Sequence, residues 1–390
     1  MSKGMSENDS MLNDLKAIAK SRVSRRSVLA GAGAVGAGSL LAACGGGGGS
    51  ETDVRWGNWT LYLDYDSDAK VYPTLEDFMS ETGISVKYLE DYNDNDEFYG
   101  KVQGQLKLKE DIGYDLICPT DWMAARYIRL GYAQKLDKAN IPNAKNILPA
   151  LASVPYDTGR DYSLTWQGIM GGFTWNKEKI PNGVKTLDDL FAPANKGKIE
   201  VLSELRDTVG VIMMAQGVDI SKFTSDQYYN ALDFLEKKIA DGFIRQVKGN
   251  DYKEDLISGD AVAVIGWSGD AFQLAAENDG KFDFAIPESG GTISADNFII
   301  PSTAQNKDKV EQLINYYYDP VVAAKVAAYV NYITPVQGAQ EAMEQVDPSL
   351  VNNELIFPSA KTQASLQVFR ALTPAEESEF TDAFQKATGN

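Results

Sequence analysis

The feature that most constrains the fold is an alternation of short strand-like runs with single helical segments. Val54–Trp59 is an apolar and aromatic run typical of a strand, and apolar residues return at 84–88 and 115–118. Helices are predicted between these runs, over 73–80 and, after a turn with helix-capping residues at 93–96, to about 109. Strands joined by single helices form βαβ units, so the pattern predicts a largely parallel sheet.

The alternation starts again in the second half of the chain. Strands are predicted at 171–176, 198–202 and 261–267, with helices beginning near Ser225 and covering Tyr252–Ser258. The length of 390 residues also suggests about two domains. Two α/β units of this size predict two lobes with a cleft between them. Ligands of open α/β sheets bind beyond the carboxyl ends of the strands, so the chemistry is expected there.

Composition and charge exclude several classes of function. The chain has no His, which excludes Ser-His-Asp triads, Cys-His pairs and His-ligated zinc or haem. Its two Cys cannot build a disulfide framework or a Cys-rich metal site. Asp and Glu total 55 against 37 Lys and Arg, and the resulting charge of −18 argues against nucleic acid as a partner. A cationic ligand is compatible with this acidic balance.

The first residues have the pattern of an export signal. Segment 1–43 contains a basic region with Arg25-Arg26, which resembles a twin-arginine signal, and then an apolar run over 28–43. Leu-Ala-Ala before Cys44 resembles a lipobox, in which the Cys is acylated, and 44–52 is a Gly-rich tether. We therefore expect an exported protein that Cys44 anchors to the outer side of the cell membrane. The alternative is an uncleaved membrane anchor.

Aromatic and polar side chains gather where predicted strands end. They are Trp59, Thr60 and Tyr62; Thr120, Asp121 and Trp122; Glu204 and Asp207; Trp267 and Asp270; and Asp296. Carboxylates satisfy ammonium groups that leave water, and indole faces attract cations by about 0.5–2 kcal/mol. The set therefore favours a flexible organic cation. In the alternative interpretation each Trp lies in the core and each acid caps a helix or faces solvent, and Asp207 could cap the helix that contains 209–214.

Several of these stretches resemble a known family. NWTLY (58–62), YDLICPTDW (114–122), SGDAVAVIGWSGDAF (258–272), DNFIIP (296–301) and NYITP (331–335) are similar to segments of the spermidine- and putrescine-binding proteins of bacterial ABC transporters. The resemblance implies ligand-binding roles for Trp59, Thr60, Tyr62, Thr120, Trp122, Glu204, Asp207, Trp267, Asp296 as the amine anchor, and Tyr332. Asp121 and Asp270 add carboxylates near the mouth. Ser294 departs from the family, which often has a Trp at that position.

The resemblance also implies an architecture. The family has the α/β, two-lobed type II periplasmic binding protein fold, in which each lobe is a mainly parallel sheet flanked by helices and the ligand cleft lies between the lobes. The expected crossings between lobes are near 166–172 and 292–296. Lobe 1 is then 53–166 and 296–335, and lobe 2 is 172–290 and 340–390. Two crossovers act as a hinge, so a ligand is expected to close the lobes.

These observations predict a monomeric, exported solute-binding lipoprotein that captures spermidine or putrescine and delivers it to an ABC permease. No cofactor, metal or catalytic residue is expected, and ATP hydrolysis would occur on another subunit because the chain lacks a P-loop motif. One alternative is a receptor of the same fold for another small organic solute or for ferric ion, for which Tyr316-Tyr317-Tyr318 could be considered. Another is an exported hydrolase that uses paired carboxylates.

Overall fold

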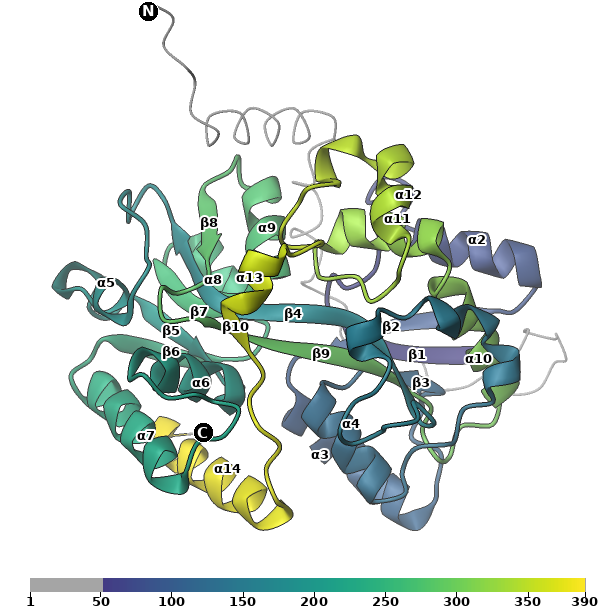
Figure 1. Cartoon of the computed structure of the whole chain (residues 1–390), viewed down its shortest axis with the longest axis horizontal. Coiled ribbons are helices and arrows are strands. Elements are labelled where there is room, and N and C mark those ends of the chain that lie inside the picture. Colours follow the sequence, from purple (N-terminus) through teal and green to yellow (C-terminus); the bar gives the residue numbers. More distant parts are fainter. Residues whose placement is uncertain (1–51, 390) are drawn as a thin grey trace, which may run out of the picture.

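The structure is a computed structural model that describes residues 52–389. A mixed sheet runs through the middle of the molecule and helices cover both of its faces (Figure 1). The strands are β1 (Val54–Trp59), β2 (Val86–Tyr92), β3 (Leu116–Ile117), β4 (Ser163–Asn176), β5 (Ile199–Leu202), β6 (Ile244–Lys248), β7 (Ala263–Trp267), β8 (Phe282–Ala285), β9 (Gly291–Ile299) and β10 (Leu366–Gln367). The alternation in the sequence is therefore confirmed as a strand-and-helix fold.

The helices lie between the strands. They are α2 (Pro73–Thr82), α3 (Asn95–Leu108), α4 (Asp121–Arg129), α5 (Leu187–Leu190), α6 (Leu205–Ala215), α7 (Ser225–Ala240), α8 (Tyr252–Ser258), α9 (Ser268–Glu277), α10 (Lys307–Tyr317), α11 (Pro320–Val330), α12 (Ala339–Val346), α13 (Ala360–Ala364) and α14 (Pro374–Thr388). Short 3-10 turns cover Lys138–Asn140, Pro142–Asn146, Pro149–Leu151, Pro193–Asn195 and Pro348–Leu350. Within residues 52–389, no helix combines the length and the apolar character needed to cross a bilayer.

Local sequence signals explain most of these boundaries. Gly83 ends α2 in the left-handed conformation, with a φ of 72° that a side chain would oppose. The Asp94 carboxylate accepts hydrogen bonds from backbone N–H groups in the first turn of α3, and Thr224 begins α7 in a capping box with Gln227. Pro320 occupies the first turn of α11, where its missing N–H costs nothing.

The sheet is parallel at both ends and antiparallel in the middle. Its strand order is β2-β1-β3-β9-β4-β7-β5-β6, with β10 beside β9 and β8 beside β4. β1 pairs in parallel with β2 and β3, and β5 pairs in parallel with β6 and β7. The long strands β4 and β9 join these two parallel groups by antiparallel pairing.

β4 and β9 are the two connections between the halves of the molecule. They pair antiparallel from Ser163–Ile299 to Gly171–Thr292, so the two expected crossings lie next to each other and are hydrogen-bonded together. Only the last part of β4, from 171, was expected as a strand. In its earlier residues polar and apolar side chains alternate only as far as Gln167, and all of β4 is nevertheless buried.

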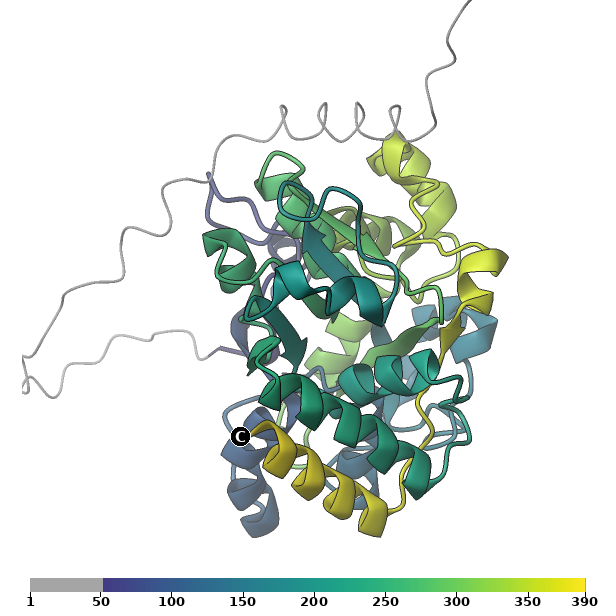
Figure 2. The same ribbon diagram turned by 90° about the vertical axis from the view of Figure 1, so that its left-hand side faces the viewer.

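Two separate hydrophobic cores lie on either side of this junction. The first core contains Trp56 and Phe298, and the second contains Phe173 and Phe380. In the second, α7 and α14 lie side by side below the sheet (Figures 1 and 2). The Figure 2 view, turned by 90°, also shows the helical layers above and below the sheet.

The segment after α11 packs on the first core. Met343 of α12, Leu350 and Ile356 are buried in that core, and α12 lies against α11. We had expected lobe 2 to resume at residue 340, so this packing supports moving that end of lobe 1 toward residue 356. The bounds of the lobes stay a prediction. The signal segment 1–43, Cys44 and most of the tether lie outside the described residues.

Candidate functional site

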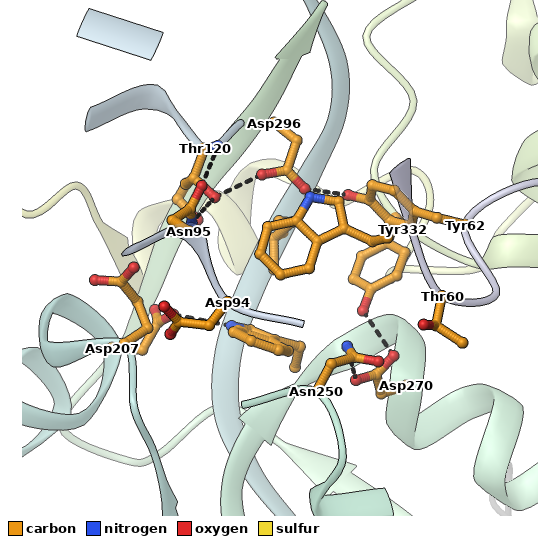
Figure 3. A pocket seen from close by; sticks show the side chains of 15 residues that line it. Thr60, Tyr62, Asp94, Asn95, Thr120, Asp207, Asn250, Asp270, Asp296 and Tyr332 are labelled. Carbon is orange, nitrogen blue, oxygen red and sulfur yellow. Dashed lines mark hydrogen bonds between the residues drawn. The ribbon is translucent and has the colours of Figure 1, made fainter. Parts of the chain in front are cut away.

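A cavity lies where the two cores face each other, at the carboxyl ends of several strands. Its empty volume is about 500 Å³, including the part open to solvent. The residues that line it are Trp59, Thr60, Tyr62, Asp94, Asn95, Thr120, Ile169, Glu204, Asp207, Asn250, Trp267, Asp270, Ser294, Asp296 and Tyr332. Figure 3 shows these side chains converging on a common space. The position agrees with the rule that open α/β sheets bind ligands at strand ends.

Most residues predicted from the sequence lie in this lining. The structure brings together Trp59, Thr60, Tyr62, Thr120, Glu204, Asp207, Trp267, Asp270, Asp296 and Tyr332. It does not place Asp121 or Trp122 in the lining, although both belong to the same strand-end cluster as Thr120. Ser294 also lines the cavity.

Asp121 is a structural acid rather than part of the cavity wall. Its carboxylate accepts hydrogen bonds from the Ala295 backbone N–H at 2.9 Å, from Asn297 Nδ2 at 2.9 Å and from the Tyr156 hydroxyl. These contacts tie the start of α4 to β9. All of them join residues that are far apart in the sequence, which explains why a local pattern could not reveal them.

Trp122 lies beside the cavity, between two arginines. The guanidinium carbon of Arg206 is 3.8 Å from the centroid of the indole ring, and that of Arg126 is 5.0 Å away. Trp122 Nε1 donates a hydrogen bond to Glu204 Oε2 at 3.0 Å. The ring is therefore engaged by cations of the protein itself, which is the cation–π attraction we had expected for a ligand.

Asp296 is a buried acid of the lining whose hydrogen-bond donors are neutral. It lies on β9 and is 1% exposed. Its carboxylate accepts hydrogen bonds from the Tyr62 hydroxyl at 2.8 Å and from Thr120 Oγ1 at 2.7 Å (Figure 3). No Lys or Arg among residues 52–389 forms an ion pair with it. Burial raises the pKa of Asp296 to about 7, although its two hydrogen bonds oppose the shift.

Asp207 resembles Asp296 in having neutral partners. It lies in the first turn of α6 and accepts hydrogen bonds from Trp267 Nε1 at 2.9 Å and from Thr292 Oγ1. Burial raises the pKa of this carboxyl as well. Gly171 permits the arrangement, because a Cβ there would lie 2.2 Å from Thr292 Oγ1 and 3.0 Å from Asp207 Oδ1.

Glu204 forms an ion pair with an arginine of the protein, Arg206. It is the N-cap of α6, and its Oε1 accepts from the Arg206 backbone N–H and from Arg206 Nη1, both at 3.2 Å. Burial raises the pKa of Glu204 to about 7, and the positive charge of Arg206 opposes that shift. This acid therefore differs from Asp207 and Asp296 in its charge balance.

Asp270 is surrounded by donors. Its Oδ1 accepts from Tyr332 Oη at 3.1 Å and from Lys253 Nζ at 3.2 Å. Its Oδ2 accepts from Asn250 Nδ2 at 3.1 Å and from Tyr252 Oη at 2.9 Å. The Lys253 contact is an ion pair between side chains that are 12% and 3% exposed.

Aromatic rings from both cores form the apolar walls of the cavity. The Trp59 and Trp267 rings are 6.2 Å apart, and the Tyr62 and Tyr332 rings are 5.1 Å apart, both edge to face. Gly269 lets Tyr332 approach α9, since a Cβ there would lie 2.3 Å from the Tyr332 ring. Such walls suit methylene groups, whereas the carboxylates suit positive charge.

Sequence reasoning missed several lining residues. Asp94 and Asn95 had been interpreted as a helix-capping turn, and Asp94 does cap α3. They also follow β2 directly, so the strand-end rule could have identified them. Asn250 also follows a strand, but β6 was not among the predicted strands, and Ile169 lies inside β4 rather than at a strand end.

Two contacts close the cavity on one side, and we call them the lip. Ser203 Oγ donates to Asp94 Oδ2 at 2.8 Å, and the Asn250 backbone N–H donates to the Asn93 carbonyl at 3.2 Å. A second, open pocket lies beyond the lip and shares Asp94 and Glu204 with the cavity. The lip therefore joins the two halves where the cavity meets the outside.

The tyrosine triplet considered for iron does not line the cavity. Tyr317 and Tyr318 are buried in the first core, and Tyr316 packs against the same core. The Tyr318 hydroxyl donates to the Thr165 carbonyl at 2.6 Å. Within the described part of the chain, no group of three or more His, Cys, Asp or Glu is arranged to hold a metal ion.

The chain has two α/β cores that two strands join, and an acidic and aromatic cavity lies at their junction. This architecture is that of a solute-binding receptor with the type II periplasmic binding protein fold. Comparison with solved structures confirms the fold class. The chain belongs to the bacterial extracellular solute-binding protein family, whose sequence model matches residues 74–356. This is a family of receptors rather than of enzymes.

Individual relatives agree with this assignment. The chain is 30% identical over 311 residues to the spermidine/putrescine-binding periplasmic protein of Escherichia coli, covering 78% of this chain and 83% of the relative. It is 27% identical over 347 residues to the putrescine-binding periplasmic protein PotF of the same organism, covering 84% and 89%. A Listeria monocytogenes structure described as a spermidine/putrescine ABC transporter matches with a TM-score of 0.74 and 24% identity, covering 86% of this chain and 99% of that one.

Proposed function

We propose that the chain is an exported receptor that captures a polyamine in the cavity between its two cores and delivers it to an ABC permease. The observation that carries this proposal is the environment of Asp207 and Asp296. Both are buried, and both accept hydrogen bonds only from neutral groups within residues 52–389. A buried carboxylate without a cation is costly, and a ligand ammonium would remove that cost.

The rest of the lining fits the remainder of such a ligand. Trp59 and Trp267 contact each other edge to face in the apolar wall, and Tyr62 and Tyr332 form a second aromatic pair. Methylene segments would pack on these rings while the ammonium groups meet the acids. The two E. coli relatives are named for binding spermidine and putrescine, which supports the same ligand class.

Closure of two lobes around the ligand is part of the proposal. The two cores would move relative to each other through β4 and β9, with lobe 1 formed by 53–166 and 296–356 and lobe 2 by 172–290 and 357–390. The lip contacts join these lobes and would form on closure. The closed monomer would then present both lobe surfaces to the permease.

Mass spectrometry of small molecules released from the purified protein tests the proposed ligand class. We expect a polyamine among them. In a thermal melt, putrescine or spermidine at 100 times its dissociation constant should stabilise the protein by about 2.7 kcal/mol. Neutral and anionic amino acids serve as controls. A stabilisation by an anion alone would contradict the cationic ligand.

We also propose that Cys44 anchors the mature protein to the outer face of the membrane after removal of 1–43. The support is the twin-arginine run and the Leu-Ala-Ala-Cys sequence. Replacing Cys44 by Ser should move the protein from the membrane fraction to the soluble fraction. If the variant fractionates with membranes as the wild type does, the lipid anchor is wrong.

A further inference from the structure

An ammonium group of the protein lies next to the cavity, bound to one of the acids that line it. Lys253 lies in the first turn of α8, and its Nζ is 3.2 Å from Asp270 Oδ1 in the first turn of α9. The Asp270 side chain is buried, and the Lys253 side chain is 12% exposed. Asp270 lines the cavity, so the positive charge of Lys253 lies directly behind one part of its wall.

The hydrogen bonds of Asp270 leave no place for a second ammonium. An ionised carboxylate offers about four lone-pair sites. Two donors occupy Oδ1, namely Lys253 and Tyr332, and two occupy Oδ2, namely Asn250 and Tyr252. A ligand ammonium at Asp270 would have to displace one of these donors and would also meet the like charge of Lys253.

The other acids of the cavity differ in this respect. Asp296 has two donors, the hydroxyls of Tyr62 and Thr120, and Asp207 also has two. All four of these donors are neutral. Asp207 and Asp296 therefore each have about two free acceptor sites, and no cation of the protein is hydrogen-bonded to either carboxylate. Asp270 has no free acceptor site, and its charge is paired with that of Lys253.

We propose that Lys253 is a specificity-determining residue that blocks the Asp270 end of the cavity to cations, so that the receptor prefers a linear diamine to a polyamine with an additional ammonium. The inference rests on the proposed function. A diamine places its two charges at Asp207 and Asp296 and leaves the Lys253–Asp270 pair intact. A triamine brings a third charge that finds no free acid at the other end.

Titration calorimetry with putrescine and spermidine tests the inference on three forms of the protein. Lys253→Met removes the cation and frees one site on Asp270. Lys248→Met is the matched control, because Lys248 pairs with Asp251 and Asp255, does not line the cavity and carries the same charge. Wild type should bind putrescine more tightly than spermidine. Lys253→Met should shift the ratio of the two dissociation constants toward spermidine by about tenfold, equivalent to ~1.4 kcal/mol.

The control variant and a conservative variant define the outcomes that overturn the inference. A change in the ratio of less than about threefold in Lys253→Met, or an equal change in Lys248→Met, shows that Lys253 does not set the preference. Lys253→Arg keeps the cation and should keep the wild-type preference. This variant provides a second test if Lys253→Met does not fold. If wild type and all variants bind neither amine, the proposed function fails. If they bind both amines with an unchanged ratio, only this inference fails.

Discussion

Asp296 and Asp270 are carboxylates of the same cavity, at most 2% exposed, yet their surroundings are opposite. Asp296 has two neutral donors, Tyr62 and Thr120. Asp270 has four donors, one of which is the ammonium of Lys253. Burial is thus equal on the two sides, and only the charge and number of partners differ. The comparison teaches that the exposed fraction of an acid does not reveal whether it is available to a ligand.

The largest expected effect is the loss of affinity when Asp296 becomes Asn. Removing one member of a buried charge pair costs about 2–5 kcal/mol. Polyamine affinity should therefore fall by about 30-fold to several thousand-fold, as measured by titration calorimetry. Asp270→Asn should weaken putrescine binding much less. Comparable losses in the two variants would show that both acids hold the ligand. If Asp296→Asn lowers affinity by less than about threefold and changes only the melting temperature of the ligand-free protein, Asp296 has a structural role.

The second effect is a dependence of affinity on pH. Asp296 and Glu204 have a pKa raised to about 7 by burial, and a bound ammonium favours their ionised forms. Binding below pH 7 should then release protons, so affinity should rise by up to about tenfold per pH unit for each proton as pH approaches about 7, and should level off above it. Calorimetry in buffers of different ionisation enthalpy measures this release. Asp296→Asn should reduce the slope, and an unaltered slope would remove Asp296 as its source.

The ligand-free protein should show the reverse trend in stability. A carboxyl with a folded-state pKa raised above its unfolded value stabilises the fold at low pH. That contribution is lost as pH rises through the folded pKa, here about 7 for Asp296 and Glu204. The melting temperature of the ligand-free protein should therefore rise by several degrees from pH 8 to pH 5.5. Saturating ligand should flatten the trend, and a ligand-free melt that is constant with pH would contradict these pKa shifts.

The smallest expected effect concerns the contact between α4 and α14, outside the cavity. Glu377 forms ion pairs with Arg126, Arg129 and Arg206, at 3.2, 3.0 and 3.6 Å, and so joins helices of both cores. Glu377→Gln should weaken this bridge and lower the affinity for putrescine and spermidine equally, by about threefold, because closure becomes less favourable. Glu379→Gln, which changes an acid on the same helix, is the control. Unequal losses for the two amines would indicate a direct role in the site.

The parts of the site that the sequence predicted are those governed by topology. Parallel strands place their carboxyl ends at one edge, so Trp59 and Thr120 could be grouped without knowing any contact. Trp267 ends β7 in the other parallel group, and it joined them through the expectation that the two lobes face each other across a cleft. The bounds of β1, α8 and the end of β7 could be predicted because strong apolar runs and Gly or Pro mark them. Local periodicity and turn chemistry are sufficient for such elements.

The parts that the sequence did not reveal depend on distant partners. Asp121 and Trp122 follow a strand, as Thr120 does, but neither lines the cavity. Asp121 accepts a hydrogen bond from Asn297, and the Trp122 ring packs against Arg206. The pairing of Lys253 with Asp270 arises where the first turns of two helices meet, which no spacing rule predicts. The full length of β4 was also hidden, because its buried residues include Gly, Thr and Gln as well as apolar side chains.

The lip has a consequence for the timing of transport. Ser203 and Asp94, together with the backbone contact of Asn250 with Asn93, close one side of the cavity against the outer pocket. Opening the two lobes requires these bonds to break, so they contribute to the residence time of a captured solute. The acidic surroundings act earlier, because negative charge speeds the encounter with a cation. Arrival and departure therefore depend on different features of the molecule, and weakening the lip at Ser203, which does not line the cavity, would shorten the dwell of the solute.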